Sequence, residues 1–208
     1  MSAIFEWARS ENVQPEPVTV EIWRELPEDF CRQFEVVNGD LVRAESPTRP
    51  HQKAGRRLAN LIEAAAETHM SRHQDGCLDV DTDFDVVLWE LPSATIRRPD
   101  VALFDCAPPG LRPLPATLIH LMVEIVSPGS EKVDIAQKKA EYALAGIPWY
   151  WIVWIGDNRI DSIEVLVLDH ALRQYRPHAV LEPGGDAVVD LPVRIKLDWD
   201  SLGSSLAR

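Results

Sequence analysis

Two acidic residues on apolar segments constrain the fold of this chain more than any other feature. The run Arg97-Arg98-Pro99-Asp100 leads directly into four apolar residues, 101–104, and Glu124 lies inside the apolar run 121–126. A carboxylate on a buried strand loses several kcal/mol of hydration unless a partner compensates its charge. Because both carboxylates occur on strand-like runs, we expect them to share one cation. This pattern is typical of a metal-dependent hydrolase.

The composition is that of a soluble globular protein with one domain. The chain has 208 residues, of which 46% are apolar and 26% are charged, which is enough for one hydrophobic core of ordinary size. No apolar run reaches the roughly 18 residues that a bilayer span needs. The first residues also lack the basic start and apolar centre of a secretory signal. We therefore expect no membrane segment.

The cysteines predict reduced thiols. Cys31, Cys77 and Cys106 are odd in number, far apart in the sequence and without CxxC spacing. Such spacing indicates neither a disulfide framework nor a zinc site. Since disulfides are rare in the cytosol, we expect a cytoplasmic protein whose thiols are reduced.

The net charge limits the kinds of nucleic-acid contact that the chain can make. With 33 acidic and 21 basic residues it carries a formal charge of −12, whereas a protein that coats nucleic acid needs a basic surface. An enzyme that touches DNA at one place is not excluded, because the basic residues gather locally. Each group could equally be ordinary solvated surface. The groups are Lys53, Arg56 and Arg57; Arg97 and Arg98; and Lys132, Lys138 and Lys139.

Local patterns predict a single α/β domain over residues 19–208, preceded by an N-terminal arm over residues 1–18. Thr19 is expected to cap a short helix, and Asn38-Gly39 is expected to form the type I′ turn of a hairpin. Hydrophobic periodicity and helix-stop signals predict two longer helices, and apolar or alternating runs predict the strands. The helices cover 51–69 and 131–145, and the strands cover 77–89 (as one strand or a tight pair), 101–104, 121–126, 149–154 (as a central strand), 163–168, 174–175 and 193–197.

The carboxylates at positions 100 and 124 suit a hard divalent cation. Oxygen ligands favour Mg²⁺ or Mn²⁺, which keep coordination positions for water and a phosphate. A nearby lysine would position the water or stabilise the pentavalent transition state. On the helix 131–145, Lys138 lies one turn from Tyr142, whereas Lys139 points deeper into the apolar stripe. Helical geometry leaves the choice between the two lysines open.

Each candidate also has a simpler explanation. Without Glu124, Asp100 after a proline would more often be a turn residue. His51 would more often cap a helix or pack as a neutral imidazole than bind a metal. Glu35 could be the solvent-facing residue of its hairpin, and core and rim packing accounts for the seven tryptophans.

An ordered set of motifs extends from about Thr19 to Leu202. It consists of Phe34-Glu35-Val36-Val37-Asn38-Gly39-Asp40-Leu41, His51, Arg98-Pro99-Asp100-Val101, Val123-Glu124-Ile125-Val126-Ser127-Pro128, Asp134, Lys138, Tyr142, Gly146-Ile147-Pro148 and Tyr150-Trp151-Ile152-Val153. This set resembles the Uma-two family, a group of restriction-endonuclease-like proteins in the PD-(D/E)xK nuclease superfamily. Single motifs such as Pro-Asp are weak signals, but the ordered set is a strong one.

The resemblance implies a restriction-endonuclease-like fold, in which helices flank a mixed β-sheet and further antiparallel strands are added. It implies Asp100 and Glu124 as metal ligands and Lys138, four residues before the helix tyrosine, as the catalytic lysine. Glu35 and His51 match further site residues of the family. In the wider superfamily the lysine stands two positions after the second acid, where this chain has Val126. Lys138 would therefore have to reach the same point in space from the helix.

The function implied is a Mg²⁺-dependent or Mn²⁺-dependent phosphodiesterase, with endonuclease action on DNA as the favoured activity. An RNA-directed nuclease would use the same chemistry. The alternative is a non-catalytic domain on the nuclease fold that binds a partner or regulates one, which the net charge of −12 favours. We expect a homodimer, because cutting both strands of a duplex usually takes two sites; fold analogy alone supports this.

Overall fold

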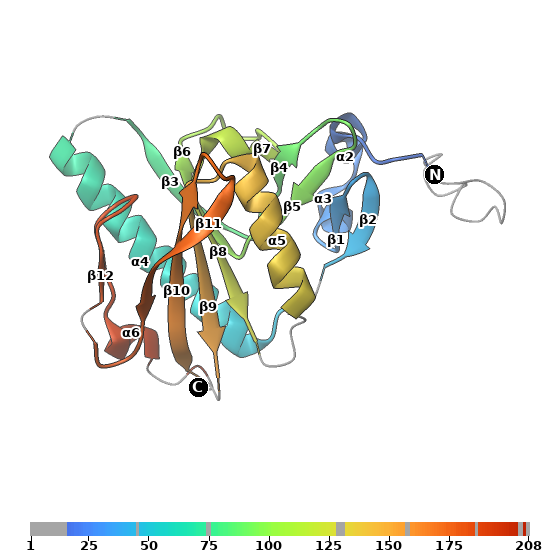
Figure 1. The fold of residues 1–208 in the computed structure, drawn as a ribbon. Helices are drawn as coiled ribbons and strands as arrows, with labels where there is room; N and C mark the ends of the chain where they lie inside the picture. Colours follow the sequence, from blue (N-terminus) through green and yellow to red (C-terminus); the bar gives the residue numbers. More distant parts are fainter. Residues whose placement is uncertain are drawn as a thin grey trace.

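A six-stranded mixed sheet forms the centre of the computed structural model (Figure 1). The structure describes residues 16–44, 46–73, 76–127, 132–156, 159–185, 187–203 and 206, with the backbone alone for residues 132–134. In spatial order the strands are β11 (Gln174–Leu181), β10 (Ile160–Asp169), β9 (Trp149–Ile155), β8 (Ile119–Val126), β6 (Val101–Asp105) and β3 (Leu78–Thr82). β8 and β9 pair in parallel, and the other neighbours are antiparallel. The aromatic strand β9 lies inside the sheet, as its sequence predicts.

A second, five-stranded sheet carries the N-terminal hairpin. Its strands, in spatial order, are β2 (Asp40–Arg43), β1 (Phe34–Val37), β5 (Thr95–Arg97), β4 (Val86–Trp89) and β7 (Leu114–Pro115). The predicted turn is confirmed, since Asn38 has φ 52° and Gly39 has φ 87°, the left-handed angles of a type I′ hairpin. The helices α2 (Val20–Glu25) and α3 (Glu28–Cys31) pack on this sheet around the fully buried Trp23. Thr19 caps α2 as predicted, because its hydroxyl accepts a hydrogen bond from the Ile22 amide at 3.3 Å.

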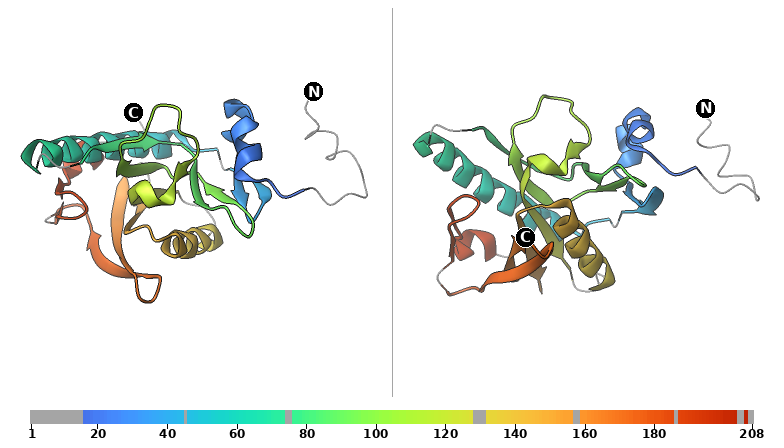
Figure 2. Two further views of the ribbon diagram at one scale, coloured as in Figure 1. Left: turned by 90° about the horizontal axis from the view of Figure 1, so that it is seen from above. Right: turned by 45° about the horizontal axis from the view of Figure 1, so that its top comes forward.

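Two long helices cover opposite faces of the six-stranded sheet (Figure 2). α4 (Arg49–His73) buries Ala54, Leu58 and Ile62 against one face. α5 (Lys132–Ala145) buries Tyr142 and neighbouring apolar residues against the other face. Gly146, with φ 85°, ends α5 as predicted.

The remaining elements are short. They are η1 (Ala116–Leu118), the two-stranded ribbon of β12 (Val188–Val189) with β13 (Ile195–Lys196), and α6 (Trp199–Gly203). The ribbon and α6 complete the core under α4. Within the described part of the chain, no helix combines the length and the apolar composition that crossing a membrane requires.

Two predictions about chain organisation need correction. The segment 77–89 is neither one strand nor a tight pair, because β3 joins the six-stranded sheet and β4 the five-stranded one. Between them Asp83 takes the left-handed region at φ 52°, which turns the chain from one sheet to the other. The predicted arm over residues 1–18 also ends too late, since Val18 is buried and its amide donates to the Gly39 carbonyl at 2.8 Å. Residues 1–15 lie outside the described residues.

The prediction of three reduced thiols is wrong for two of the cysteines. Cys77 and Cys106 form a disulfide, with their Cα atoms 5.2 Å apart, and only Cys31 is a free, buried thiol. The pairing follows from the antiparallel register of β3 and β6. Leu78 pairs with Asp105, so the residues just beyond that pair, Cys77 and Cys106, lie opposite one another. The inference of a cytoplasmic location from reduced thiols therefore loses its support.

Candidate active site

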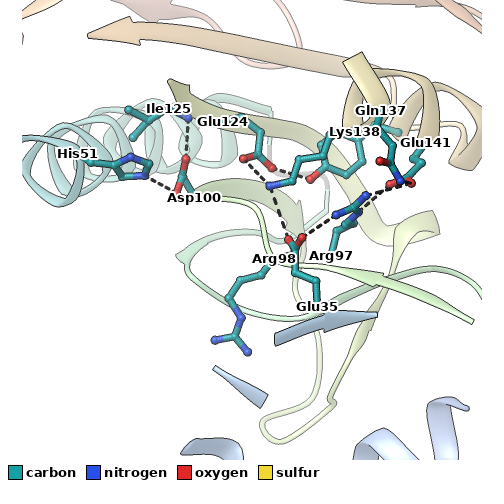
Figure 3. Close-up of polar contacts among 11 residues, drawn as sticks. Glu35, His51, Arg97, Arg98, Asp100, Glu124, Ile125, Gln137, Lys138 and Glu141 are labelled. Atoms are coloured by element: carbon teal, nitrogen blue, oxygen red, sulfur yellow. Dashed lines mark hydrogen bonds and ion pairs between the residues drawn. The ribbon is translucent and has the colours of Figure 1, made fainter. Parts of the chain in front are cut away.

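The two acids singled out in the sequence lie near one another, Asp100 just before β6 and Glu124 within the neighbouring strand β8. Val101 of β6 pairs with Val123 of β8 in an antiparallel ladder, and Asp100 immediately precedes β6, so the chain brings Asp100 beside Glu124 at this end of the two strands. The Ile125 amide donates to Asp100 Oδ2 at 2.6 Å, which fixes that carboxylate against β8. Figure 3 shows the two carboxylates between His51 on one side and Lys138 on the other.

His51 approaches Asp100 from the first turn of α4. Its Nε2 lies 2.7 Å from Asp100 Oδ1, and both side chains are 17% exposed. Burial would lower the pKa of His51, but the hydrogen bond to Asp100 and the negative charges of Asp100, Glu124 and Asp83 outweigh it, so the pKa is raised. The His51 side chain is therefore a hydrogen-bonding partner of the Asp100 carboxylate. It is neither a simple helix cap nor a neutral packing residue.

Glu124 receives two donors from α5. Lys138 Nζ lies 3.1 Å from Glu124 Oε2, and the Tyr142 hydroxyl donates to Oε1 at 2.6 Å. Burial raises the pKa of Glu124 to about 7, although the charge of Lys138 opposes the shift. Lys139 makes no ion pair with any described residue. Of the two candidate lysines, it is thus Lys138 that reaches the acid.

Glu35 lies inside the molecule rather than on the solvent face of its hairpin. It is 7% exposed, its Oε1 accepts a hydrogen bond from the Arg98 amide at 3.0 Å, and Lys138 Nζ lies 3.6 Å from the same oxygen. Burial alone would raise the pKa of Glu35, but Lys138 and Arg97 outweigh it, so the pKa is lowered. Lys138 consequently lies between two carboxylates, those of Glu35 and Glu124 (Figure 3).

A buried ion network supports this arrangement, and sequence reasoning missed its two main members. Arg97 is 2% exposed; its Nη1 donates to Glu35 Oε2 at 2.7 Å, and its Nε and Nη2 donate to both oxygens of Glu141 at 2.7 and 3.0 Å. Gln137 adds a further donor to Glu141 at 2.8 Å. One sequence feature could have indicated that Glu141 belongs to the site. It stands three residues after Lys138 on α5, and this spacing places the two side chains on one helix face.

An open groove leads to Asp100 from solvent. It has a volume of about 390 Å³ and lies between the first half of α4 and the end of β3 with the loop that follows it. His51 and Arg56 line its helix side, and Asp81 and Asp83 line the opposite wall. The carboxylate of Asp100 is thus accessible to a substrate, whereas Glu124 is buried among its partners.

The donor set fits a hard divalent cation with few protein ligands. Asp100 and Glu124 supply oxygen atoms, and burial of Glu124 with its raised pKa means that its negative charge is incompletely compensated. Among the described residues, no three His, Cys, Asp or Glu side chains gather at a metal-binding spacing. A small cation here would therefore keep water or phosphate oxygens as its other ligands, which is the usual coordination of Mg²⁺.

Comparison with known proteins identifies the fold and the family of this chain. A crystal structure from Anabaena variabilis ATCC 29413, described as "a putative nuclease belonging to DUF820", superposes with a TM-score of 0.62 over 91% of this chain and 99% of that chain, at 15% sequence identity. At that identity the likeness shows the fold. No curated protein sequence matches significantly. The model of the Uma2 family, described as "Putative restriction endonuclease", matches residues 22–200. The chain therefore belongs to the Uma2 family.

Proposed function

We propose that this protein is a divalent-metal-dependent endonuclease that hydrolyses phosphodiester bonds in DNA, with Asp100 and Glu124 as the metal ligands. The observation that carries the proposal is the proximity of the two acids: Asp100 Oδ2 accepts a hydrogen bond from the amide of Ile125, the residue after Glu124, and Lys138 Nζ lies 3.1 Å from Glu124. A bound Mg²⁺ or Mn²⁺ would activate water as the nucleophile and neutralise charge on the phosphoryl oxygens.

The side chains around the two acids would have distinct tasks. Lys138 brings a positive charge beside the position of the reacting phosphate, where fixed charges stabilise a transition state without reorganisation. Glu35 holds Lys138 from the other side at 3.6 Å. His51 fixes Asp100 Oδ1 at 2.7 Å and leaves that carboxylate in one orientation toward the groove.

The test is cleavage of plasmid DNA, single-stranded DNA and RNA with Mg²⁺, with Mn²⁺ and with EDTA. We expect cleavage of DNA that EDTA abolishes and that falls by orders of magnitude in Asp100→Asn, because the variant keeps the shape of the side chain but loses its charge. Cleavage that survives both EDTA and Asp100→Asn would refute the metal mechanism. No cleavage of any substrate with either metal would favour the non-catalytic binding domain instead.

The two adjacent lysines on α5 provide a matched pair. Lys138→Met should lose cleavage by at least about 100-fold, the scale of removing one transition-state donor, while thermal unfolding confirms the fold. Lys139→Met makes the same chemical change one residue away and should retain activity, since Lys139 contacts neither carboxylate. Equal losses in the two variants would contradict the assignment of Lys138.

A further inference from the structure

The first turns of α4 carry a group of positive charges that is unfavourable for the helix in two ways. Arg49, Lys53, Arg56 and Arg57 all lie within them, and no acidic residue precedes Glu63 on this helix. The partial positive charge at a helix N-terminus disfavours cations there, and like charges three or four residues apart repel one another. Burial and the charges of Arg57, Arg56 and Arg49 accordingly lower the pKa of Lys53. Unfavourable local choices of this kind are expected at functional sites.

Three of these cations form a ridge along the helix. Positions 49, 53 and 56 fall within about 60° of one another at 100° per residue, opposite the core-facing Leu58. The ridge spans about 10 Å along the axis, close to the rise of three nucleotides in one strand of a duplex. We define these three residues, Arg49, Lys53 and Arg56, as the α4 ridge.

The α4 ridge adjoins the candidate active site. Arg56 lines the groove that also contains His51 and Asp100, so the ridge meets the groove at Arg56. The opposite wall carries two acids, Asp81 and Asp83, which would repel phosphates, whereas the helix wall carries Arg56 and one acid, Glu63. A polyanion that reaches Asp100 would therefore lie along the helix side of the groove.

We propose that the α4 ridge binds consecutive backbone phosphates of the DNA strand that enters the active site. The proposal rests on the nuclease function proposed above and adds the surface that holds the substrate. In a chain with a net charge of −12, binding of a polyanion requires such a local concentration of positive charge. The phosphates would also relieve the repulsion among the ridge residues and complement the helix N-terminus.

The test measures binding of a short labelled DNA duplex by fluorescence anisotropy in EDTA, at several salt concentrations between about 50 and 200 mM. The variant Arg49→Gln, Lys53→Gln, Arg56→Gln removes three cations and keeps good helix formers. The slope of log K against log salt should fall by about three, which is about one for each lost phosphate contact. Thermal unfolding of the variant should show a cooperative transition like that of the wild-type protein, so that the change in slope reports lost phosphate contacts and not a loss of the fold.

A matched control changes three exposed arginines at β10 and β11. Arg159→Gln, Arg173→Gln, Arg176→Gln alters the net charge by the same amount at exposed residues outside α4 and outside the lining of the groove, and its salt slope should equal that of the wild-type protein. Equal slopes in the two triple variants, or no binding of DNA by the wild-type protein at low salt, would overturn the proposal.

The same measurements separate this proposal from the nuclease function. If the wild-type protein cleaves DNA but the ridge variant binds like the control, the nuclease function stands and the phosphate surface is refuted. If binding depends on the ridge but no metal supports cleavage, the phosphate surface is supported and the nuclease function fails.

Discussion

Removal of the buried guanidinium of Arg97 should destabilise the fold in a pH-dependent way. Arg97→Met keeps an apolar side chain of similar length and leaves Glu35 and Glu141, each with a side chain 9% exposed, without their shared cation. Arg97 makes three charge-assisted hydrogen bonds of 2.7, 2.7 and 3.0 Å. At about 1.5–3 kcal/mol each, their gross contribution is roughly 5–9 kcal/mol.

The net loss should be smaller than this gross value. Lys138 remains 3.6 Å from Glu35, and Gln137 still donates to Glu141 at 2.8 Å. Breaking a buried ion pair by removing one partner typically costs about 3–5 kcal/mol, so we expect a loss of about 4 kcal/mol in the free energy of unfolding at pH 8. Urea denaturation followed by circular dichroism measures it.

The sign of the pH dependence follows from the carboxylates. In the wild-type protein the pKa of Glu35 is lowered, because Lys138 and Arg97 outweigh the effect of burial. Its contribution to stability is therefore present above the unfolded pKa and is lost as the pH falls through the lowered folded pKa. Without Arg97 the pKa of Glu35 should rise, so the variant can protonate its unpaired acid, and the difference between variant and wild type should shrink between pH 8 and pH 5.

An exposed arginine gives the reference for this measurement. Arg176 is 67% exposed and pairs with Asp169 at 3.2 Å, so Arg176→Met should cost less than about 1 kcal/mol at either pH. A loss in Arg97→Met as small as that in Arg176→Met would refute the reasoning. A large loss that does not change between pH 8 and pH 5 would refute the electrostatic account and leave only lost packing.

Two further predictions concern stability. Burial raises the pKa of Glu124 to about 7, so its contribution to the stability of the metal-free protein is present below the unfolded pKa and is lost as the pH rises through about 7. Glu124→Gln should remove this pH-dependent loss of stability, measured by urea denaturation in EDTA. A variant with the same pH profile as the wild-type protein would contradict the prediction. Cys77→Ser removes a disulfide between residues 29 positions apart, so the loop-entropy relation gives a loss of about 3–4 kcal/mol in the free energy of unfolding. A reductant should destabilise the wild-type protein but not the variant. Equal sensitivity of the two proteins to the reductant would contradict the pairing.

The parts of the site that could be predicted from the sequence are those carried by single elements or neighbouring strands. Asp100 and Glu124 stand out because each is an acid at an apolar run, and pairing of β6 with β8 brings them close together. The sequence narrows the choice of the catalytic lysine to Lys138 and its neighbour Lys139. Helical periodicity goes no further, because it fixes the face of α5 only to within about one residue. The contact of Lys138 with Glu124 depends on how the helix docks.

The parts that could not be predicted depend on pairing between distant elements. Arg97 and Glu141 are 44 residues apart and meet only because the five-stranded sheet lies against α5. Cys77 and Cys106 meet through the register of β3 with β6, which no local spacing rule detects. Taken alone, Arg97 and Glu141 could each be a solvated surface residue, and each cysteine could be a free thiol. Only the partner that the fold brings to each residue shows that the first two form a buried ion pair and the cysteines a disulfide.

The position of Lys138 on a helix follows from the face of β8 that carries Glu124. Val126 projects from the same face two residues later and is buried with Tyr142 in the core beneath α5. A lysine there would have to place its charge in that apolar layer, whereas a lysine on α5 reaches Glu124 Oε2 at 3.1 Å from the edge of the layer. Its location then depends on how α5 is held, and Arg97 joins Glu141 of α5 to Glu35 of the hairpin. The buried ion network thus stabilises the fold and fixes Lys138 between its two carboxylates.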